Sequence, residues 1–282
     1  MSTGPAAQAH AIVAGLGAGG GTPASSDGGW RLDRSAVVDR LHELVAEPSR
    51  VRQGRLNLCG PAVLFMVWLE HDPVAAVTYA ARLFEDGRAS IGSLAVTPSA
   101  GLRNRGYGRT ERGLSCPQAD WMMMAALRDS SNRVLRYSRQ GGPTEATAAI
   151  TMPGALRLWL GATGLFAQIR DETTLVLRKG IGHARDLVPS PDRELALLLA
   201  LEMFRHPPTL VGRARDRIVS LVPNHWVLLR SPIVPAGPGL VTFRFWSWGA
   251  EHSVVMARAT FTRGYHGCLD AQFTLRHVAS GA

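Results

Sequence analysis

Cys59 is the residue of this chain whose position is best suited to chemistry. It stands near the end of the segment at residues 53–62, directly before the apolar run at residues 63–69. Asn57 can cap a helix and Pro61 suits its first turn, so this order predicts a loop that delivers the thiol to the start of a buried helix. The partial positive charge and unpaired N–H groups of a helix N-terminus favour a thiolate over a thiol. Cys59 is therefore a candidate nucleophile, and a buried structural cysteine is the alternative.

His225 is the second candidate. It follows Pro223 and Asn224 and precedes the apolar residues 226–229, which predicts a strand with the imidazole at its mouth. Residues 241–249 alternate strongly, and a loop rich in Pro and Gly joins the two runs, so they favour an antiparallel pair. A lone histidine at a strand end is usually structural, and the candidate therefore depends on its combination with the cysteine.

The elements that must position these two residues fall into two halves. The periodicity predicts helices at residues 33–45, 59–70, 72–86, 117–129 and 151–164. It predicts strands at residues 165–170, 173–177, 218–222, 224–231, 240–248 and 253–262, and leaves residues 194–204 open between a helix and a buried strand. Helices first and antiparallel strands later predict an α+β fold with the site at the seam.

This order of an early helical cysteine and a late histidine on a sheet resembles the papain-like cysteine hydrolases. Residues 57–62 look like the Cys-Gly-Pro-Ala entry of the bacteriocin-processing peptidases and of related papain-fold bacterial toxins. Gln53 stands six residues before Cys59, which is the spacing of the oxyanion-hole glutamine in papain-like enzymes. The resemblance implies one domain at residues 30–282, in which a helical N-terminal half with the nucleophile helix packs on a C-terminal antiparallel sheet.

The third catalytic position departs from this family. Papain-like enzymes orient the histidine with an Asn or Asp on the following strand, and residues 241–249 contain neither. Ser247 lies at about the expected place, and its hydroxyl can fix the imidazole tautomer, but it brings no negative charge. Glu251, His252 and Asp270 are the other candidates for this position. Trp246 and Trp248 either shield the pair from water or simply pack in the core.

The resemblance implies a mechanism and a biological role. Cys59 would attack a carbonyl, His225 would move the proton, and the Cys59 N–H with the Gln53 amide would meet the oxyanion. The substrate would be a protein or peptide, and the protein would be a bacterial effector toxin with an immunity protein as partner. It would reside in the bacterial cytoplasm before a specialised secretion system delivers it to a target cell. A glutamine deamidase or transglutaminase-like toxin, or an inactive papain-fold binding module, are the alternatives.

Composition agrees with a large single domain. The 282 residues are 46% hydrophobic and 19% charged, so the core needs no support from a metal or a disulfide. The three cysteines, Cys59, Cys116 and Cys268, are odd in number and widely spaced, which argues for a reducing compartment or a reactive thiol. No CxxC or HxxxH pair is present, so we expect neither a structural zinc site nor a cofactor.

The net charge of +9 does not by itself indicate a nucleic-acid partner. Lys179 is the single lysine among 31 basic residues, and this arginine bias is typical of high-GC bacterial coding. The arginines gather at residues 103–112 and 213–217, where Tyr107 is the one aromatic residue of the first cluster and no motif of nucleic-acid binding is present. We therefore expect no nucleic-acid partner.

Residues 1–29 differ from the rest in composition. Ala, Gly, Ser and Thr dominate, no Lys or Arg precedes Arg31, and the Gly-x-Gly-x-x-Gly pattern at residues 15–20 lacks the helix that a dinucleotide site requires. We expect a flexible tail whose removal leaves the fold unchanged. No apolar stretch reaches 18 uncharged residues, so we expect no membrane span.

Overall fold

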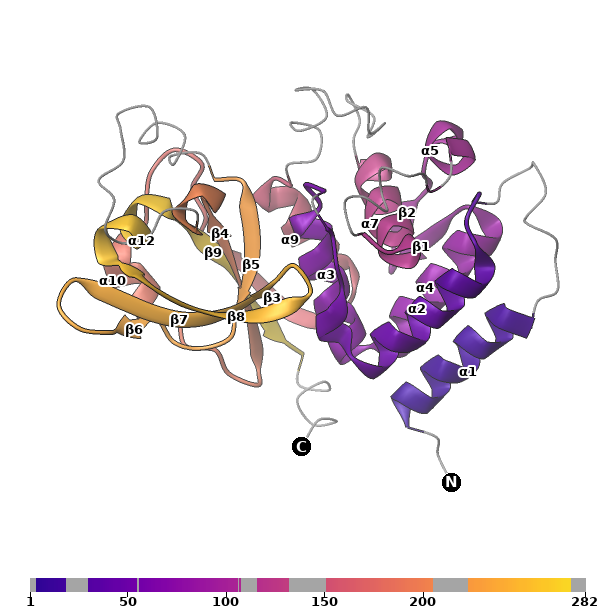
Figure 1. Cartoon of the computed structure of the whole chain (residues 1–282), viewed down its shortest axis with the longest axis horizontal. Helices are drawn as coiled ribbons and strands as arrows, with labels where there is room; N and C mark the ends of the chain where they lie inside the picture. The colour runs from indigo at the N-terminus through magenta and orange to yellow at the C-terminus, as the bar shows by residue number, and fades with distance from the viewer. Residues whose placement is uncertain are drawn as a thin grey trace. The chain divides into compact units, whose positions relative to one another are not determined.

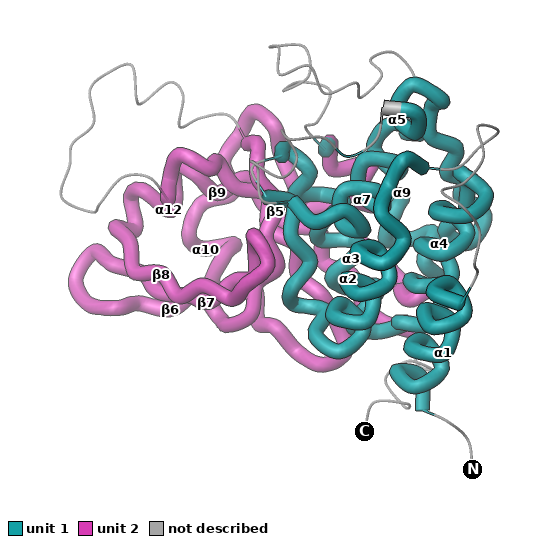
Figure 2. The backbone as a smooth tube through the Cα atoms, turned by 45° about the vertical axis from the view of Figure 1, so that its right-hand side comes forward, with its two compact units in different colours: residues 1–151, 158–164 teal, residues 152–157, 165–282 magenta. Residues whose placement is uncertain are grey.

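The computed structural model describes residues 4–18, 30–54, 56–105, 107, 116–131, 151–204 and 223–274. The chain divides into two compact units, shown in different colours in Figure 2. The first unit comprises residues 1–151 and 158–164, and the second comprises residues 152–157 and 165–282. Helix α9 (Pro153–Ala162) is divided between them.

The first unit is helical. Its elements are α1 (Pro5–Ala18), α2 (Arg34–Ala46), the short helix η1 (Pro48–Arg50), α3 (Cys59–His71), α4 (Pro73–Asp86), the hairpin of β1 (Ala89–Ile91) and β2 (Leu94–Val96), α5 (Ala100–Arg105) and α7 (Gln118–Ser131). Local signals set several boundaries. The Asp33 carboxylate accepts hydrogen bonds from the first N–H groups of α2, Asp72 does the same for α4, and Gly87 ends α4 in the left-handed conformation at φ 67°. These three boundaries were predicted from the sequence and are confirmed.

Helix α1 contradicts the expectation of a flexible tail. Ala9, Val13 and Leu16 share one face of the helix and are buried, because the helix lies against α2 and α4 (Figure 1). The side chain of Arg34 also donates to the carbonyl oxygen of Leu16 at 2.8 Å, near the end of α1. The composition hid this helix, because small residues around a sparse apolar stripe also occur in linkers. The expected tail is wrong for residues 5–18, and residues 1–3 and 19–29 lie outside the described residues.

The second unit is built on an antiparallel sheet. Its strands are β3 (Phe166–Asp171), β4 (Arg193–Leu199), β5 (His225–Leu229), β6 (Val234–Pro235), β7 (Leu240–Ser247), β8 (Ala250–Ala257) and β9 (Tyr265–Phe273). The strand order is β3-β9-β4-β5-β7-β6, and β8 pairs with β7 along its whole length (Figure 1). The described part of this unit also contains the short helices α10 (Gly180–Arg185), η2 (Leu201–Phe204) and α12 (Arg258–Gly264).

The core of the second unit follows from strand alternation. In β7, Val241, Phe243 and Phe245 point to one face and are buried, and in β5 the buried Val227 and Leu229 join them. The opposite face of the same strands also carries buried tryptophans. Both faces of β5 are thus covered, so its five residues, His225 included, are all buried.

The predicted α+β class is confirmed, with several boundaries corrected. Residues 193–199 are the buried strand β4, residues 173–177 form no strand, and the strand expected at 253–262 ends at Ala257, where α12 begins. Strand β9 was not predicted, and the strand expected at 218–222 lies outside the described residues. Among the described helices, none combines the length and the apolar character needed to cross a bilayer.

Candidate functional site

Cys59 is the first residue of α3. Leu58 occupies the cap position and makes no side-chain capping bond, and Asn57 is exposed, so the expected cap at Asn57 is wrong. Pro61 lies in the first turn as predicted, where a backbone N–H would have no partner within the helix. The cysteine is 4% exposed. The sequence therefore predicted correctly that the helix begins at Cys59, but it predicted the wrong cap residue.

Helix α3 holds Cys59 on a rigid support. All eleven residues from Cys59 to Leu69 are buried, against α4 and α7 among other elements. Gly60 is required by packing, because a Cβ atom at this position would lie 2.5 Å from the side chain of Thr151. The aromatic rings of Phe65, Trp68 and Tyr79 pack together further along the helix. The start of α3 is consequently fixed by packing along its length.

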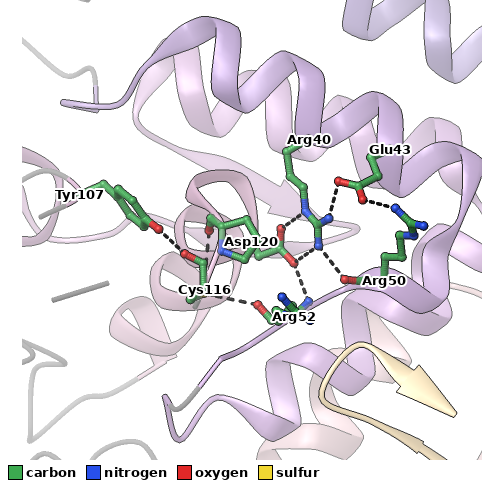
Figure 3. Close-up of polar contacts among 8 residues, drawn as sticks. Arg40, Glu43, Arg50, Arg52, Tyr107, Cys116 and Asp120 are labelled. Atoms are coloured by element: carbon green, nitrogen blue, oxygen red, sulfur yellow. Dashed lines mark hydrogen bonds and ion pairs between the residues drawn. The ribbon is translucent and has the colours of Figure 1, made fainter. Parts of the chain in front are cut away.

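Gln53 lies in the loop before α3 and is 5% exposed. A buried ion pair anchors the residues just before it (Figure 3). Asp120, on α7, accepts from the Arg40 Nε at 2.7 Å and from the Arg52 backbone N–H at 2.6 Å. Arg40 also donates to the carbonyl oxygen of Arg50 at 2.6 Å. The network therefore ties residues 50–52 to α2 and α7 and so positions the loop that carries Gln53.

Sequence reasoning missed this network. The signal was a single acidic residue, Asp120, within the apolar stretch of α7, since a buried carboxylate requires a partner. The partner could not be identified from spacing, because Arg40 lies 80 residues away in the chain.

The surroundings of Cys116 and Cys268 are unlike those of a nucleophilic cysteine. The Cys116 thiol donates to the carbonyl oxygen of Arg52 at 3.4 Å, and burial, with the nearby Asp120 carboxylate, raises the pKa of this thiol well above its ordinary value (Figure 3). Burial and the nearby Glu172 and Asp270 carboxylates raise the pKa of Cys268 to about 12. Both thiols are therefore protonated at neutral pH, and none of the three cysteines forms a disulfide.

His225 is the first residue of β5 and is 2% exposed. Its Nε2 lies 2.9 Å from the Oγ of Ser247, and its ring stacks on Trp248 with a centroid distance of 4.6 Å and an interplanar angle of 13°. The expected contact between His225 and Ser247 is therefore present. Burial lowers the pKa of His225 to about 3, so the imidazole is neutral at neutral pH.

The other candidates for the third position have different partners. Glu251 pairs with Arg244 at 3.3 Å on the exposed side of β7 and β8, and Asp270 pairs with Arg193 at 3.3 Å. The Nε2–H of His252 donates to the backbone oxygen of Ser247 at 3.0 Å. Of these residues, His252 thus supports the Ser247 backbone.

Trp248 adopts a strained conformation. The turn between β7 and β8 has two central residues, Trp248 at φ 51° and Gly249 at φ 82°, which is the type I′ geometry of tight hairpins. A residue with a Cβ atom pays about 1–2 kcal/mol for the left-handed conformation. The turn brings the indole onto the His225 ring. Trp246, by contrast, is buried within the sheet.

The candidate residues are distributed over both units. Gln53 and Cys59 belong to the first unit, and His225 and Ser247 belong to the second. Each half of the candidate site is held by its own unit: the loop and helix start in one, the histidine with its serine and tryptophan in the other.

Comparison of this chain with models of protein families, with curated proteins and with solved structures finds no significant match. The functional conclusion therefore rests on the residues themselves.

Proposed function

We propose that this chain is a papain-like cysteine hydrolase that cleaves peptide or amide bonds. The observation that carries the proposal is the position of Cys59 as the first residue of a buried helix, where the helix dipole favours a thiolate. Its N–H belongs to the first turn of the helix, and in the proposed mechanism this N–H donates to the oxyanion. Gln53, in the anchored loop, is the second oxyanion donor.

The reaction follows from the two ring nitrogens of His225. Its Nε2 faces Ser247, so Nδ1 is the atom that takes the thiol proton. The Cys59 sulfur then bonds to the carbonyl carbon, and the leaving amine departs with the proton from Nδ1. Water hydrolyses the thioester in the second half of the reaction, which releases the acid and restores the thiol.

The low pKa of His225 shapes this mechanism. Within the described residues no carboxylate hydrogen-bonds the ring, so no negative charge in contact with the ring stabilises an imidazolium before substrate binds. His225 therefore starts as a neutral imidazole and carries a positive charge only after it has taken a proton.

The mechanism requires that Cys59 and His225, which belong to different units, come together, and disulfide trapping tests this requirement. In a His225→Cys variant, oxidation should link the new thiol to Cys59, because a disulfide forms when the two Cα atoms lie within about 7 Å. The matched control, His225→Cys with Cys59→Ser, should give no such cross-link. A variant that stays unlinked under conditions that oxidise exposed thiols would contradict the proposed pair.

Thiol reactivity and turnover test the nucleophile. Iodoacetamide at mildly acidic pH should label Cys59 before Cys116 and Cys268, whose pKa values burial and nearby carboxylates raise. Cys59→Ala should abolish hydrolysis of a peptide library, while Gln53→Ala should lower the rate about 10²–10³-fold. Equal labelling of the three thiols in the folded protein would exclude Cys59 as the nucleophile.

Ser247 is the proposed orienting residue. Ser247→Ala should reduce turnover by less than the roughly 10⁴-fold expected for a charged orienter, because it releases only the tautomer and the ring angle. His225→Ala should reduce it far more. If Ser247→Ala has no effect and Asp270→Asn or Glu251→Gln abolishes turnover, the orienter is elsewhere.

A binding module without activity is the second candidate. The observation in its favour is the buried, neutral His225, whose ring nitrogen contacts Ser247 and not the Asn or Asp of papain-like enzymes. In that case Cys59 reacts no faster than an ordinary thiol and the peptide library remains intact.

The proposed biological role rests on the resemblance to papain-fold toxins. We propose a bacterial effector that acts on a protein or peptide substrate after export, with an immunity protein in the producing cell. Ammonia release from glutamine-containing peptides, without chain cleavage, would instead identify a deamidase. Expression of the chain in a bacterial host, compared with its Cys59→Ala variant, tests toxicity that depends on the thiol.

A further inference from the structure

A cluster of Glu172, His183 and Cys268 lies within the second unit and includes neither His225 nor Ser247. Each residue offers one ligand atom, and the three atoms all lie within 4.8 Å of one another. The residues come from three segments: Glu172 follows β3, His183 belongs to α10, and Cys268 belongs to β9.

The backbone brings these segments together at Gly267. This residue has φ 103°, and a Cβ atom on it would lie 2.2 Å from the carbonyl oxygen of Glu172 and 2.8 Å from the Cα of Thr173. The N–H of Glu172 donates to the carbonyl oxygen of Cys268 at 2.9 Å. Glycine is therefore needed for the close approach that sets Glu172 beside Cys268.

A bulge in β9 places the side chains of Tyr265 and Cys268 on the same face of the sheet. The register with β4 pairs Cys268 with Leu197 and Tyr265 with Leu199, so that β9 has one extra residue in this interval. Tyr265 and Cys268 consequently face the same side, both are fully buried, and the tyrosine hydroxyl hydrogen-bonds the cysteine sulfur.

His183 connects the tyrosine to the carboxylate. Its Nδ1 lies 2.7 Å from the Tyr265 hydroxyl, and its Nε2 lies 2.5 Å from an oxygen of Glu172. With Cys268 as a thiol, every proton in this chain points from sulfur towards the carboxylate. With Cys268 as a thiolate, the direction reverses: Tyr265 donates to sulfur, Nδ1 donates to Tyr265, and the Nε2 lone pair faces the carboxylate.

In the reversed arrangement, three electron-pair donors converge: a thiolate, an imidazole nitrogen and a carboxylate oxygen. We propose that Glu172, His183 and Cys268 form a binding site for a divalent transition-metal ion of the zinc class, with Tyr265 orienting the histidine. Mixed sulfur, nitrogen and oxygen ligands suit zinc, and three protein ligands leave a fourth position for water. A hydrogen bond to the second ring nitrogen is the usual support of a metal-bound histidine.

The cluster can admit an ion from solvent. The side chains of His183 and Glu172 are 21% and 40% exposed, whereas Cys268 is fully buried. Two ligands of a tetrahedral zinc lie about 3.3 Å apart, given bonds of about 2.0–2.1 Å. Glu172 must therefore withdraw by somewhat less than 1 Å from His183, and its exposure allows this.

Binding should release one proton. The thiol arrangement holds three protons, on sulfur, on the tyrosine oxygen and on Nε2, whereas the metal-bound arrangement holds two, on the tyrosine oxygen and on Nδ1. The sulfur–proton bond is lost as the sulfur–metal bond forms, and no electron is transferred.

Cobalt(II) titration of the full chain, after treatment with a chelator, tests the site. A thiolate ligand gives a cobalt charge-transfer band in the near ultraviolet, and we expect saturation at one cobalt per chain, one proton released, and displacement of cobalt by zinc. Saturating zinc should raise Tm by about 5 °C or more. Absence of the band at a tenfold excess of cobalt would overturn the proposal.

Variants identify the ligands. Cys268→Ser should remove the charge-transfer band, whereas Cys116→Ser, which also replaces a buried thiol, should retain it. Glu172→Gln changes a half-buried residue outside the hydrophobic core, so the fold should persist, and it should weaken cobalt binding about tenfold or more. A band that persists in Cys268→Ser, or unchanged affinity in Glu172→Gln, would refute this ligand set and leave the cluster as a proton-sharing network.

Discussion

Asp120 should be the most costly polar residue to remove from the first unit. Asp120→Ala removes the acceptor of Arg40 Nε at 2.7 Å, of Arg40 Nη2 at 3.1 Å and of the Arg52 N–H at 2.6 Å. Asp120 is fully buried, and the Arg40 side chain is 11% exposed. Loss of one partner from a buried ion pair costs about 3–5 kcal/mol, because the other charge stays buried.

Two features place the expected loss at the lower end of that range. Glu43 still contacts Arg40 at 2.5 Å, and both side chains line an open hollow of about 740 Å³ through which water can reach the guanidinium. We therefore expect Asp120→Ala to lower the free energy of unfolding of this unit by about 3 kcal/mol. The loop that carries Gln53 should loosen as well, because its anchor at Arg52 is lost.

Urea unfolding measures the global effect, and hydrogen exchange at the Arg52 amide measures the local one. The matched control is Arg40→Met combined with Asp120→Leu, which removes both charges. It should cost less than the sum of Arg40→Met alone and Asp120→Leu alone by about 1.5 kcal/mol or more. A loss below about 1 kcal/mol for Asp120→Ala, strict additivity in the cycle, or an unchanged exchange rate at Arg52 would refute the reasoning.

Three further outcomes are expected. Val13→Asp on the buried face of α1 should lower the free energy of unfolding of the first unit by about 2–3 kcal/mol. Ala14→Asp on the exposed face should change it by no more than about 0.5 kcal/mol. Equal urea midpoints for the two variants would mean that α1 does not pack on the unit. Because the pKa of His225 falls from 6.5 to about 3 on folding, its contribution to stability is complete above pH 6.5 and is lost as the pH falls towards 3. That loss should be about 3 kcal/mol at pH 4, and acid titration of His225→Gln should lack it. The Trp248→Gly variant should be more stable to thermal unfolding than Trp248→Ala by about 1 kcal/mol, because glycine adopts a positive φ without steric strain. The reverse order would show that the turn is not strained.

Features that depend on neighbouring residues were predictable. The caps at Asp33 and Asp72 and the left-handed stop at Gly87 were identified from sequence, because each satisfies helix-end groups within four residues. The contact of Ser247 with His225 was also expected, since strand alternation and an antiparallel pair fix which side chains share a face. The start of α3 at Cys59 was located by the change from polar loop to apolar run.

Features that depend on distant residues were not predictable. The pairing of Asp120 with Arg40 joins α7 to α2, and the packing of α1 depends on its contacts with α2 and α4. The cluster at Cys268 requires a glycine at φ 103° and a bulge, and neither leaves a spacing motif in the chain. The catalytic role of Cys59 remains a prediction for the same reason, because its proposed base lies in another unit.

The position of β9 in the sheet constrains how the second unit folds. Residues 265–273 lie between β3 and β4, so that β3 has its pairing partner about a hundred residues later in the chain. Such distant pairing is slow, because the entropy of closing a long loop is lost before the contacts form. Until β9 arrives, β3 and β4 each present an unpaired edge that can recruit another chain. A ribosome that stalls before residue 265 would therefore hold an aggregation-prone intermediate, and chaperone demand should fall abruptly once this strand has emerged.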